Sequence, residues 1–258
     1  MKTLSLQDKV IFLTGGSGGI GWDCARAYAA EGAKIIIAAH NGEAVNQSVA
    51  KLGSDHLGIH CDVQRDDQVG AAIKTALARY GRLDAVHNNA GIGSPAKPIH
   101  QTTGEEWDAL FNVNLKSILH TTRHAFDALV ASKGCILNTS SLVGVIGQEN
   151  HAAYTATKGG MNALTKSMAL DYTKYGIRVN AVCPAGAWTP MLRQWCAEQP
   201  NPDSTERYLN EIHPLGYCPE GDAIADACCF LLSDKARFVT GHLMHVSGGA
   251  ELGYRRVL

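Results

Sequence analysis

Two side chains four residues apart, Tyr154 and Lys158, could together perform acid–base chemistry. They lie at the start of residues 152–172, whose apolar pattern predicts a long helix. Positions i and i+4 share one helix face, so the phenol and the ammonium would project the same way. A nearby cation lowers a tyrosine pKa from about 10, as a general base near neutral pH requires. Ser141, after the apolar run 135–139, could hydrogen-bond the oxygen that gains or loses the proton.

On its own, this spacing is a weak signal. Tyrosine and lysine are common, and a pair at positions i and i+4 on a helix surface accounts for an isolated match better. The rest of the chain has to supply the context.

A glycine-rich turn near the start of the chain supplies the first part of it. Residues 9–14 are an apolar run typical of a buried strand, and the segment Gly15-Gly-Ser-Gly-Gly-Ile-Gly21 leads into a helix predicted over 22–31. Glycines let the backbone turn tightly and approach a pyrophosphate at the helix N-terminus, where free N–H groups favour an anion. A turn without a ligand is the less favoured alternative, because this one lies between a buried strand and a helix.

The end of the next predicted strand, 34–39, bears on which dinucleotide binds. A site for NAD usually has an acidic residue there to hold the ribose hydroxyls, whereas this chain has Ala39-His40-Asn41. No carboxylate repels a 2′-phosphate there and no arginine binds one, but His40 and Asn41 could donate hydrogen bonds to it. The sequence therefore slightly favours NADP over NAD.

Strand and helix patterns alternate along the chain, which predicts one α/β domain. Further strands are predicted at 56–61, 83–87, 135–139, 177–183 and 242–246, and further helices at 66–80, 104–131, 152–172 and 219–232. Short connections between alternating elements produce a parallel sheet with helices on both faces. We therefore expect a single-domain Rossmann fold over residues 1–258, with a doubly wound seven-stranded parallel sheet.

The alternation breaks at residues 185–216, which contain Trp188, Trp195 and His213. An insertion of this length at the carboxyl end of a strand is typical of a lid over a substrate crevice. A contact between copies of the chain would also suit the aromatic residues, and is the less favoured alternative.

Composition argues against several other classes of protein. A net charge of -1 gives no bulk attraction to nucleic acid or to an anionic membrane, and no apolar run reaches the roughly 18 residues of a membrane span. Residues 1–8 are too polar for a signal peptide. The 8 cysteines contain no C-x-x-C pair, so we expect reduced thiols in a cytoplasmic protein. The 11 histidines form no ligand motif, so no metal site is predicted.

Taken together, these motifs resemble the short-chain dehydrogenases/reductases. The likeness covers essentially the whole chain, in the family's order and spacing, and rests on Thr14-Gly15-x3-Gly19-x-Gly21, Asn88-Asn-Ala-Gly91, Asn114, Ser141, Tyr154-x3-Lys158 and Arg178-Val-Asn180 with Pro184 and Thr189. It implies an enzyme that transfers hydride between a nicotinamide dinucleotide and an alcohol/carbonyl pair. It also implies a homotetramer, whose contacts the tail Arg255-Arg256 could reach.

The resemblance also implies roles for individual residues. Tyr154 would be the general acid/base, while Lys158 would lower its pKa and hold the nicotinamide ribose. Ser141 would bind the substrate oxygen, and Asn114 would support a proton relay through water. The implied cofactor contacts are Gly15, Ser17, Gly18, Gly19, Ile20, Gly21, His40, Asn41, Asp62, Val63, Asn89, Ala90, Gly91, Tyr154, Lys158, Pro184 and Thr189.

Two positions depart from the family pattern. The family commonly has Pro-Gly after the sixth strand, and here the segment is Pro184-Ala185-Gly186. The second departure is Ala39, in place of the usual acidic residue.

Within the family, the chain is most similar to the group of 17-beta-hydroxysteroid dehydrogenase type 14 and L-fucose dehydrogenase. The shared segments include Ser140-Ser-Leu-Val-Gly144, Trp188-Thr-Pro190 and Gly248-Gly-Ala-Glu-Leu-Gly-Tyr254. The expected substrate contacts, which suit a molecule with several hydroxyls such as a sugar, are Ser141, Gln148, His151, Tyr154, Trp188 and His213, with Glu251 and Tyr254 nearby.

Other functions remain as alternatives. The first is a carbonyl reductase for steroid or acyl substrates. A second, a non-catalytic NAD(P)H-binding protein, is disfavoured because Asn114, Ser141, Tyr154 and Lys158 are all present. Nucleic-acid binding is disfavoured because the chain has no basic stripe.

Overall fold

The computed structural model describes residues 4–253, and its centre is a sheet of seven parallel strands in the order β3-β2-β1-β4-β5-β6-β7. The strands are β1 Val10–Thr14, β2 Lys34–Ala39, β3 Leu57–His60, β4 Ala85–Asn88, β5 Cys135–Thr139, β6 Arg178–Pro184 and β7 Leu243–Val246. Each neighbouring pair is parallel, so all strands end at the same edge. The predicted fold class is confirmed.

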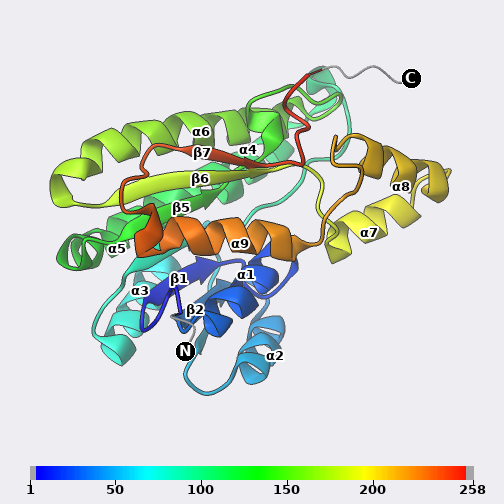
Figure 1. Ribbon diagram of the computed structural model, residues 1–258. Helices are drawn as coiled ribbons and strands as arrows, with labels where there is room; N and C mark the ends of the chain where they lie inside the picture. The colour runs from blue at the N-terminus through cyan, green and yellow to red at the C-terminus, as the bar shows by residue number, and fades with distance from the viewer. Residues whose placement is uncertain (1–3, 254–258) are drawn as a thin grey trace.

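Helices cover both faces of this sheet (Figure 1). They are α1 Gly19–Ala30, α2 Gly42–Leu52, α3 Asp66–Tyr80, α4 Gly104–Phe111, α5 Ser117–Ser132, α6 Ala152–Tyr172, α7 Pro190–Ala197, α8 Pro202–Glu211 and α9 Gly221–Leu232. One core contains Ile35 and Ile37 of β2 and packs against α1 and α9. The other contains Ile36 and packs against α3, α5 and α6. Because successive strand residues face opposite sides, a run of isoleucines fills both cores.

The helix predicted over 104–131 is interrupted by a π-helical turn, Asn112–Lys116. This turn joins α4 to α5 and contains the buried Asn114. A π-helical turn inserts extra backbone into a helix, and such turns often occur at functional sites. The apolar pattern does not reveal it, because the helices on either side have the same periodicity.

Helix α2 was not predicted, although its start signal is present. Asn41 caps it by accepting a hydrogen bond from the Ala44 backbone N–H at 3.0 Å. The helix begins directly after β2, so its N-terminus lies at the same edge as the glycine-rich turn.

Residues 185–216 are more ordered than the term lid implies. They contain the two short helices α7 and α8, which extend beyond the carboxyl ends of the strands in Figure 1. Cys196, Leu209 and Cys218 form a small apolar core of their own, with Trp188 packed against it.

Two further sequence expectations can be compared with the structure. All 8 cysteines are free thiols and all are buried. Within residues 4–253, no helix is both long and apolar enough to cross a membrane.

Candidate active site

The site lies where β1, β4, β5 and β6 end. From β1 the chain goes to β2 on one side, while β4 lies on the other side of β1. This reversal of strand order opens a crevice at the carboxyl ends of the strands, which is where α/β sheets bind ligands.

The glycine-rich turn forms the floor of this crevice. Gly15 and Gly19 have φ values of +66° and +52°, which other residues rarely adopt. A Cβ on Gly21 would collide with the Gly15 carbonyl oxygen and lie 2.5 Å from Asn89 Nδ2. Gly18, the residue directly before α1, gives the helix no side-chain cap. The N–H groups at the start of α1 are therefore available to a phosphate, which fits a dinucleotide pyrophosphate.

The turn after β4 holds the glycine-rich turn in place. Asn89 Nδ2 donates to the backbone oxygens of Thr14 and Gly15 at 3.1 and 3.3 Å. The backbone N–H groups of Asn89 and Ala90 both donate to Thr14 Oγ1 at 3.0 Å. The segment 88–91 is thus a structural brace as well as a wall of the crevice.

Tyr154, Lys158 and Ser141 come together above the end of β5, as their spacing predicts. Lys158 is 4% exposed, and its Nζ donates to the Thr139 carbonyl oxygen at 2.8 Å. The same Nζ lies 5.6 Å from the centre of the Tyr154 ring. The Ser141 side chain hydrogen-bonds the Tyr154 phenol. A phenol, a hydroxyl and an ammonium therefore surround one point at the sheet edge.

The pKa values differ from the sequence prediction. Burial raises the pKa of Tyr154, and the hydrogen bond from Ser141 opposes this only in part. Burial also lowers the pKa of Lys158 to about 8. The prediction of a lowered tyrosine pKa is therefore wrong. Removing both groups from water disfavours their charged forms, and a sequence pattern carries no information on burial.

Asn114 borders the same space from the side of the π-helical turn. Its Oδ1 accepts from the Ile92 N–H at 2.8 Å, and its Nδ2 donates to the Ile92 carbonyl oxygen at 3.0 Å. A Cβ on Gly91 would lie 3.4 Å from Asn114 Oδ1 and 3.8 Å from Lys158 Nζ. A side chain at position 91 would therefore contact both the asparagine and the lysine.

A buried chain of hydrogen bonds beneath the site was not predicted. Tyr28 Oη and His87 Nδ1 are 2.9 Å apart, and His87 Nε2 and Thr139 Oγ1 are 2.8 Å apart. Thr139 Oγ1 then donates to Asn89 Oδ1 at 3.2 Å. The chain therefore links α1 through β4 and β5 to the glycine-rich turn. No spacing in the sequence could reveal it, because each member comes from a different element.

Comparison with known proteins identifies the family. The family model described as enoyl-(acyl carrier protein) reductase matches residues 15–251. The L-fucose dehydrogenase of Bos taurus is 38% identical over 248 residues, covering 96% of this chain and 91% of that protein. The cyclopentanol dehydrogenase of Comamonas sp. is 38% identical over 249 residues, covering 95% and 97%. The chain belongs to the short-chain dehydrogenase/reductase family.

Solved structures agree with this family. The ligand-free aldohexose dehydrogenase of Thermoplasma acidophilum superposes with a TM-score of 0.90 at 31% identity, covering 100% of this chain and 99% of that one. The 3-ketoacyl-(acyl-carrier-protein) reductase of Brucella melitensis, complexed with NADH, gives 0.88 at 29% identity, covering 96% and 100%. This short-chain dehydrogenase/reductase is an oxidoreductase that acts on hydroxyl and carbonyl groups of a small molecule with a nicotinamide cofactor.

The remaining predicted cofactor residues lie along the same edge. Thr189 caps α7, and its methyl group would lie 3.6 Å from a Cβ on Gly19.

The predicted adenosine contacts lie at the ends of β3 and β2. Val63 is 6% exposed, and its carbonyl oxygen is 2.9 Å from His120 Nδ1. Asp62 Oδ1 accepts from the Gln64 N–H at 3.0 Å. Hydrogen bonds therefore hold Asp62 and Val63 in place directly after β3. His40 and Asn41, which follow β2, are exposed. Ser17, Ile20 and Pro184 lie in the turn, in α1 and at the end of β6.

The predicted substrate residues are less closely grouped. Gln148 is exposed, and His151 Nδ1 is 2.8 Å from the Glu149 carbonyl oxygen. Trp188 packs in the lid with the Arg193 guanidinium 5.1 Å from its ring. His213 is fully buried, and its Nδ1 is 2.7 Å from the Leu209 carbonyl oxygen, so in this conformation it supports the lid from below.

The Glu251 carboxylate accepts a hydrogen bond from the Ser247 hydroxyl. Tyr254 and the tail Arg255-Arg256 lie outside the described residues.

The lowered lysine pKa predicts a pH-dependent stability. Between about pH 8 and 10.5, Lys158 is neutral in the folded cofactor-free protein and charged in the unfolded chain, so folding stability rises with pH in this window. Between pH 7 and pH 10.5, the free energy of unfolding of the wild type should rise by up to about 3 kcal/mol relative to that of Lys158→Met. Denaturant unfolding of both proteins across this range measures the difference, and parallel curves would contradict a buried lysine with a lowered pKa.

Proposed function

We propose that Tyr154 is the general acid/base of an NAD(P)-dependent dehydrogenase, with Ser141 and Lys158 as its partners. The observation that carries this proposal is the convergence of the three side chains beside the dinucleotide crevice. The crevice beside these residues would hold the nicotinamide dinucleotide, which would supply the hydride chemistry when bound. Tyr154 moves the proton of the substrate oxygen, and Ser141 holds that oxygen in line with the phenol.

The electrostatics of the pair set the resting form of Tyr154. Its raised pKa makes the neutral phenol the resting form, which is the acid needed to reduce a carbonyl. Oxidation of a hydroxyl needs the phenolate, and the Lys158 cation 5.6 Å from the ring favours it. We propose that Lys158 also holds the nicotinamide ribose, and that Asn114 positions a water beside Lys158 to relay the proton to solvent.

The substitution Tyr154→Phe removes the proton-transferring oxygen and keeps the ring. It should lower kcat by about 10²–10⁴-fold and leave cofactor affinity unchanged. Lys158→Ala should lower both kcat and cofactor affinity, because we propose that this side chain both favours the phenolate and holds the nicotinamide ribose. Initial rates and cofactor titrations measure these effects, with Tyr80→Phe as the matched control. A Tyr154→Phe enzyme with full kcat would refute the role of Tyr154.

We propose that the adenosine end of the crevice slightly favours NADP(H). Ala39 is 5% exposed and carries no charge. The exposed His40 follows it, and the His60 ring would lie 3.7 Å from a Cβ on Gly42 at the start of α2. Two imidazoles and a helix N-terminus can donate hydrogen bonds to a 2′-phosphate. Glu43 in the first turn of α2 works against this, so the preference is small.

Ala39→Asp tests this proposal by adding the carboxylate that is missing. It should lower kcat/KM for NADP+ by more than about tenfold, through repulsion of the 2′-phosphate, and raise it for NAD+. Ala39→Asn is the uncharged control. A wild-type enzyme with clearly higher kcat/KM for NAD+ would contradict the proposed preference.

We propose that the substrate is a sugar or a similar polyhydroxy compound, closed in by residues 185–216 as a lid. The relatives named for L-fucose and aldohexose support this, and so do the polar Gln148 and His151, which precede Tyr154 in the sequence. A hydrophobic cyclic alcohol is the second candidate, favoured by the cyclopentanol dehydrogenase relative and by Trp188 in the lid.

Initial rates with aldoses, polyols, cyclopentanol and a hydroxysteroid separate the two candidates. We expect kcat/KM to be highest for an aldose, and Gln148→Ala to raise KM for it without changing cofactor affinity. Trp188→Ala tests the lid and should raise KM for every substrate. Turnover confined to cyclopentanol and the steroid would overturn the sugar proposal.

We propose that the chain associates with copies of itself as a homotetramer. A groove of 530 Å³ between α5 and α6 is lined in part by Leu119, Phe126, Tyr172 and Tyr175. Leu119 on α5 is 50% exposed, and Leu170, on α6 outside the groove lining, is 79% exposed. Exposed apolar side chains on adjacent helices are typical of association surfaces.

Light scattering of the full chain measures the assembly. Four copies are expected for the wild type, and fewer for Leu119→Arg. Leu215→Arg, at an exposed lid position, is the control and should keep the wild-type mass. A monomeric wild type would contradict the proposal.

A further inference from the structure

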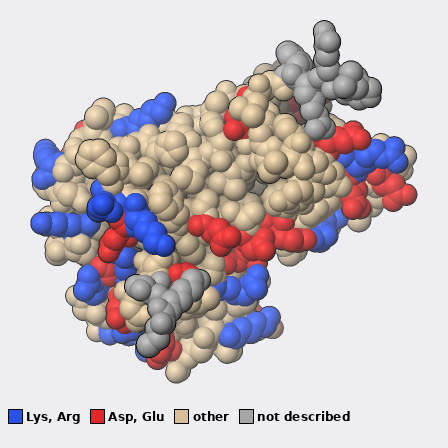
Figure 2. All heavy atoms as spheres, viewed as in Figure 1, with Lys and Arg blue, Asp and Glu red and all other residues tan. Residues whose placement is uncertain are grey.

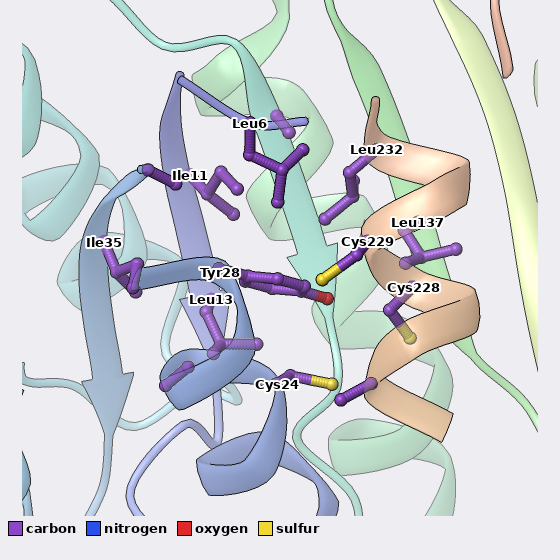
Figure 3. Packing of buried hydrophobic residues seen from close by; sticks show 14 of the residues in the cluster. Leu6, Ile11, Leu13, Cys24, Tyr28, Ile35, Leu137, Cys228, Cys229 and Leu232 are labelled. Atoms are coloured by element: carbon purple, nitrogen blue, oxygen red, sulfur yellow. The ribbon is translucent and has the colours of Figure 1, made fainter. Parts of the chain in front are cut away.

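Three metal-ligating side chains meet in the interior, between α1, β4 and α9. They are Cys24, His87 and Cys228, and one ligand atom from each lies within 4.8 Å of the other two. All three residues are 0% exposed. Figure 3 shows Cys24 and Tyr28 reaching from α1 toward α9, which carries Cys228 and Cys229. Neither the catalytic groups nor the proposed cofactor contacts include any of these five residues.

The hydrogen bonds around His87 assign its lone pair to Nδ1, the nitrogen that accepts from the Tyr28 hydroxyl. Asn89 uses its Nδ2 as a donor to two backbone oxygens, so its Oδ1 must be the acceptor for the Thr139 hydroxyl. Thr139 Oγ1 has then used its proton, and His87 must donate Nε2–H to it. Burial lowers the pKa of His87 to about 3, which keeps the ring neutral. A neutral imidazole whose other nitrogen is held by a hydrogen bond is the form that ligates metals.

The spacing and the charge both suit a zinc ion. A tetrahedral ion with Zn–S bonds of about 2.3 Å and a Zn–N bond of about 2.0–2.1 Å places its ligand atoms about 3.5–3.8 Å apart. Closing the present group onto an ion therefore needs movements of about 1 Å or less. Two thiolates neutralise the charge of the ion, which is the condition for burying a dication away from water. Thiolates and imidazole together favour zinc over magnesium or calcium.

A surface groove borders Cys229, the residue that follows the proposed ligand Cys228 on α9. A groove of 380 Å³ between α1 and α9 is lined by Ala27, Glu31, Asp226 and Cys229 among others. Figure 2 shows acidic side chains gathered along the line where α9 passes α1. Carboxylates at the mouth of a groove raise the local concentration of cations.

We propose that Cys24, His87 and Cys228 bind one zinc ion, which ties α1, β4 and α9 together. On binding, two S–H bonds break, two Zn–S bonds and one Zn–N bond form, and two protons leave to the buffer without any change of oxidation state. Tyr28 keeps its proton and loses its hydrogen bond to His87 Nδ1, and its oxygen, 2.9 Å from that nitrogen, becomes the nearest candidate for a neutral fourth ligand. The sequence predicted no metal site, because these ligands come from three distant segments.

The test uses the full chain, reduced and freed of metal with a chelator. Cadmium serves as the probe, because a thiolate bound to Cd²⁺ absorbs in the ultraviolet and a histidine bound to it does not. We expect one Cd²⁺ per chain with this absorption, and release of two protons per ion. Zinc in excess of its Kd should raise the thermal midpoint by about 5 °C or more.

Matched variants locate the site. Cys24→Ser and Cys228→Ser should lose the absorption and the zinc-dependent rise in midpoint. Cys229→Ala, the next residue on the same helix, should keep both. Circular dichroism checks that each variant is folded. If a serine variant does not fold, the corresponding alanine variant, Cys24→Ala or Cys228→Ala, takes its place. A wild type without the absorption, or folded Cys24 and Cys228 variants that retain it, would overturn the proposal.

Discussion

The buried ammonium of Lys158 is the constraint around which the site is built. Removing it from water lowers its pKa from 10.5 to about 8, a cost of about 3 kcal/mol for the charged form. The hydrogen bond from Nζ to the Thr139 carbonyl oxygen offsets part of this cost, and the end of β5 fixes that oxygen. An ammonium held in this way remains charged at neutral pH and has little freedom to turn away from Tyr154. Because the lysine is buried, water does not screen the attraction between its charge and the nearby phenolate.

Thr139 joins this catalytic side of the sheet to the cofactor side. Its carbonyl oxygen accepts from Lys158, while its hydroxyl donates to Asn89, which in turn holds the glycine-rich turn. His87 and Tyr28 extend the same chain of hydrogen bonds to α1. The position of the lysine and the shape of the phosphate-binding turn consequently depend on one residue at the end of β5. A ligand bound to His87 would therefore be connected to Lys158 and to the glycine-rich turn through Thr139 and Asn89.

Features governed by local patterns could be predicted from the sequence. Helix α6 begins and ends where its apolar period predicts, and so Tyr154 and Lys158 share a face. The glycine-rich turn follows β1 as expected, although α1 begins at Gly19 and includes two of its glycines. Features that depend on distant segments could not be predicted. The raised pKa of Tyr154, the buried position of His213, the π-helical turn at Asn114 and the meeting of Cys24, His87 and Cys228 all arise from tertiary packing.

The most direct test of the account follows the hydrogen itself. A sugar or secondary alcohol that the enzyme oxidises is labelled with deuterium on the carbon that bears the hydroxyl, and the reduced cofactor is analysed by mass spectrometry. The account predicts that each turnover carries one deuterium from that carbon to the nicotinamide ring, with none exchanged into water. Loss of the label to solvent, or oxidation of the substrate without cofactor reduction, would contradict hydride transfer at the site formed by Ser141, Tyr154 and Lys158.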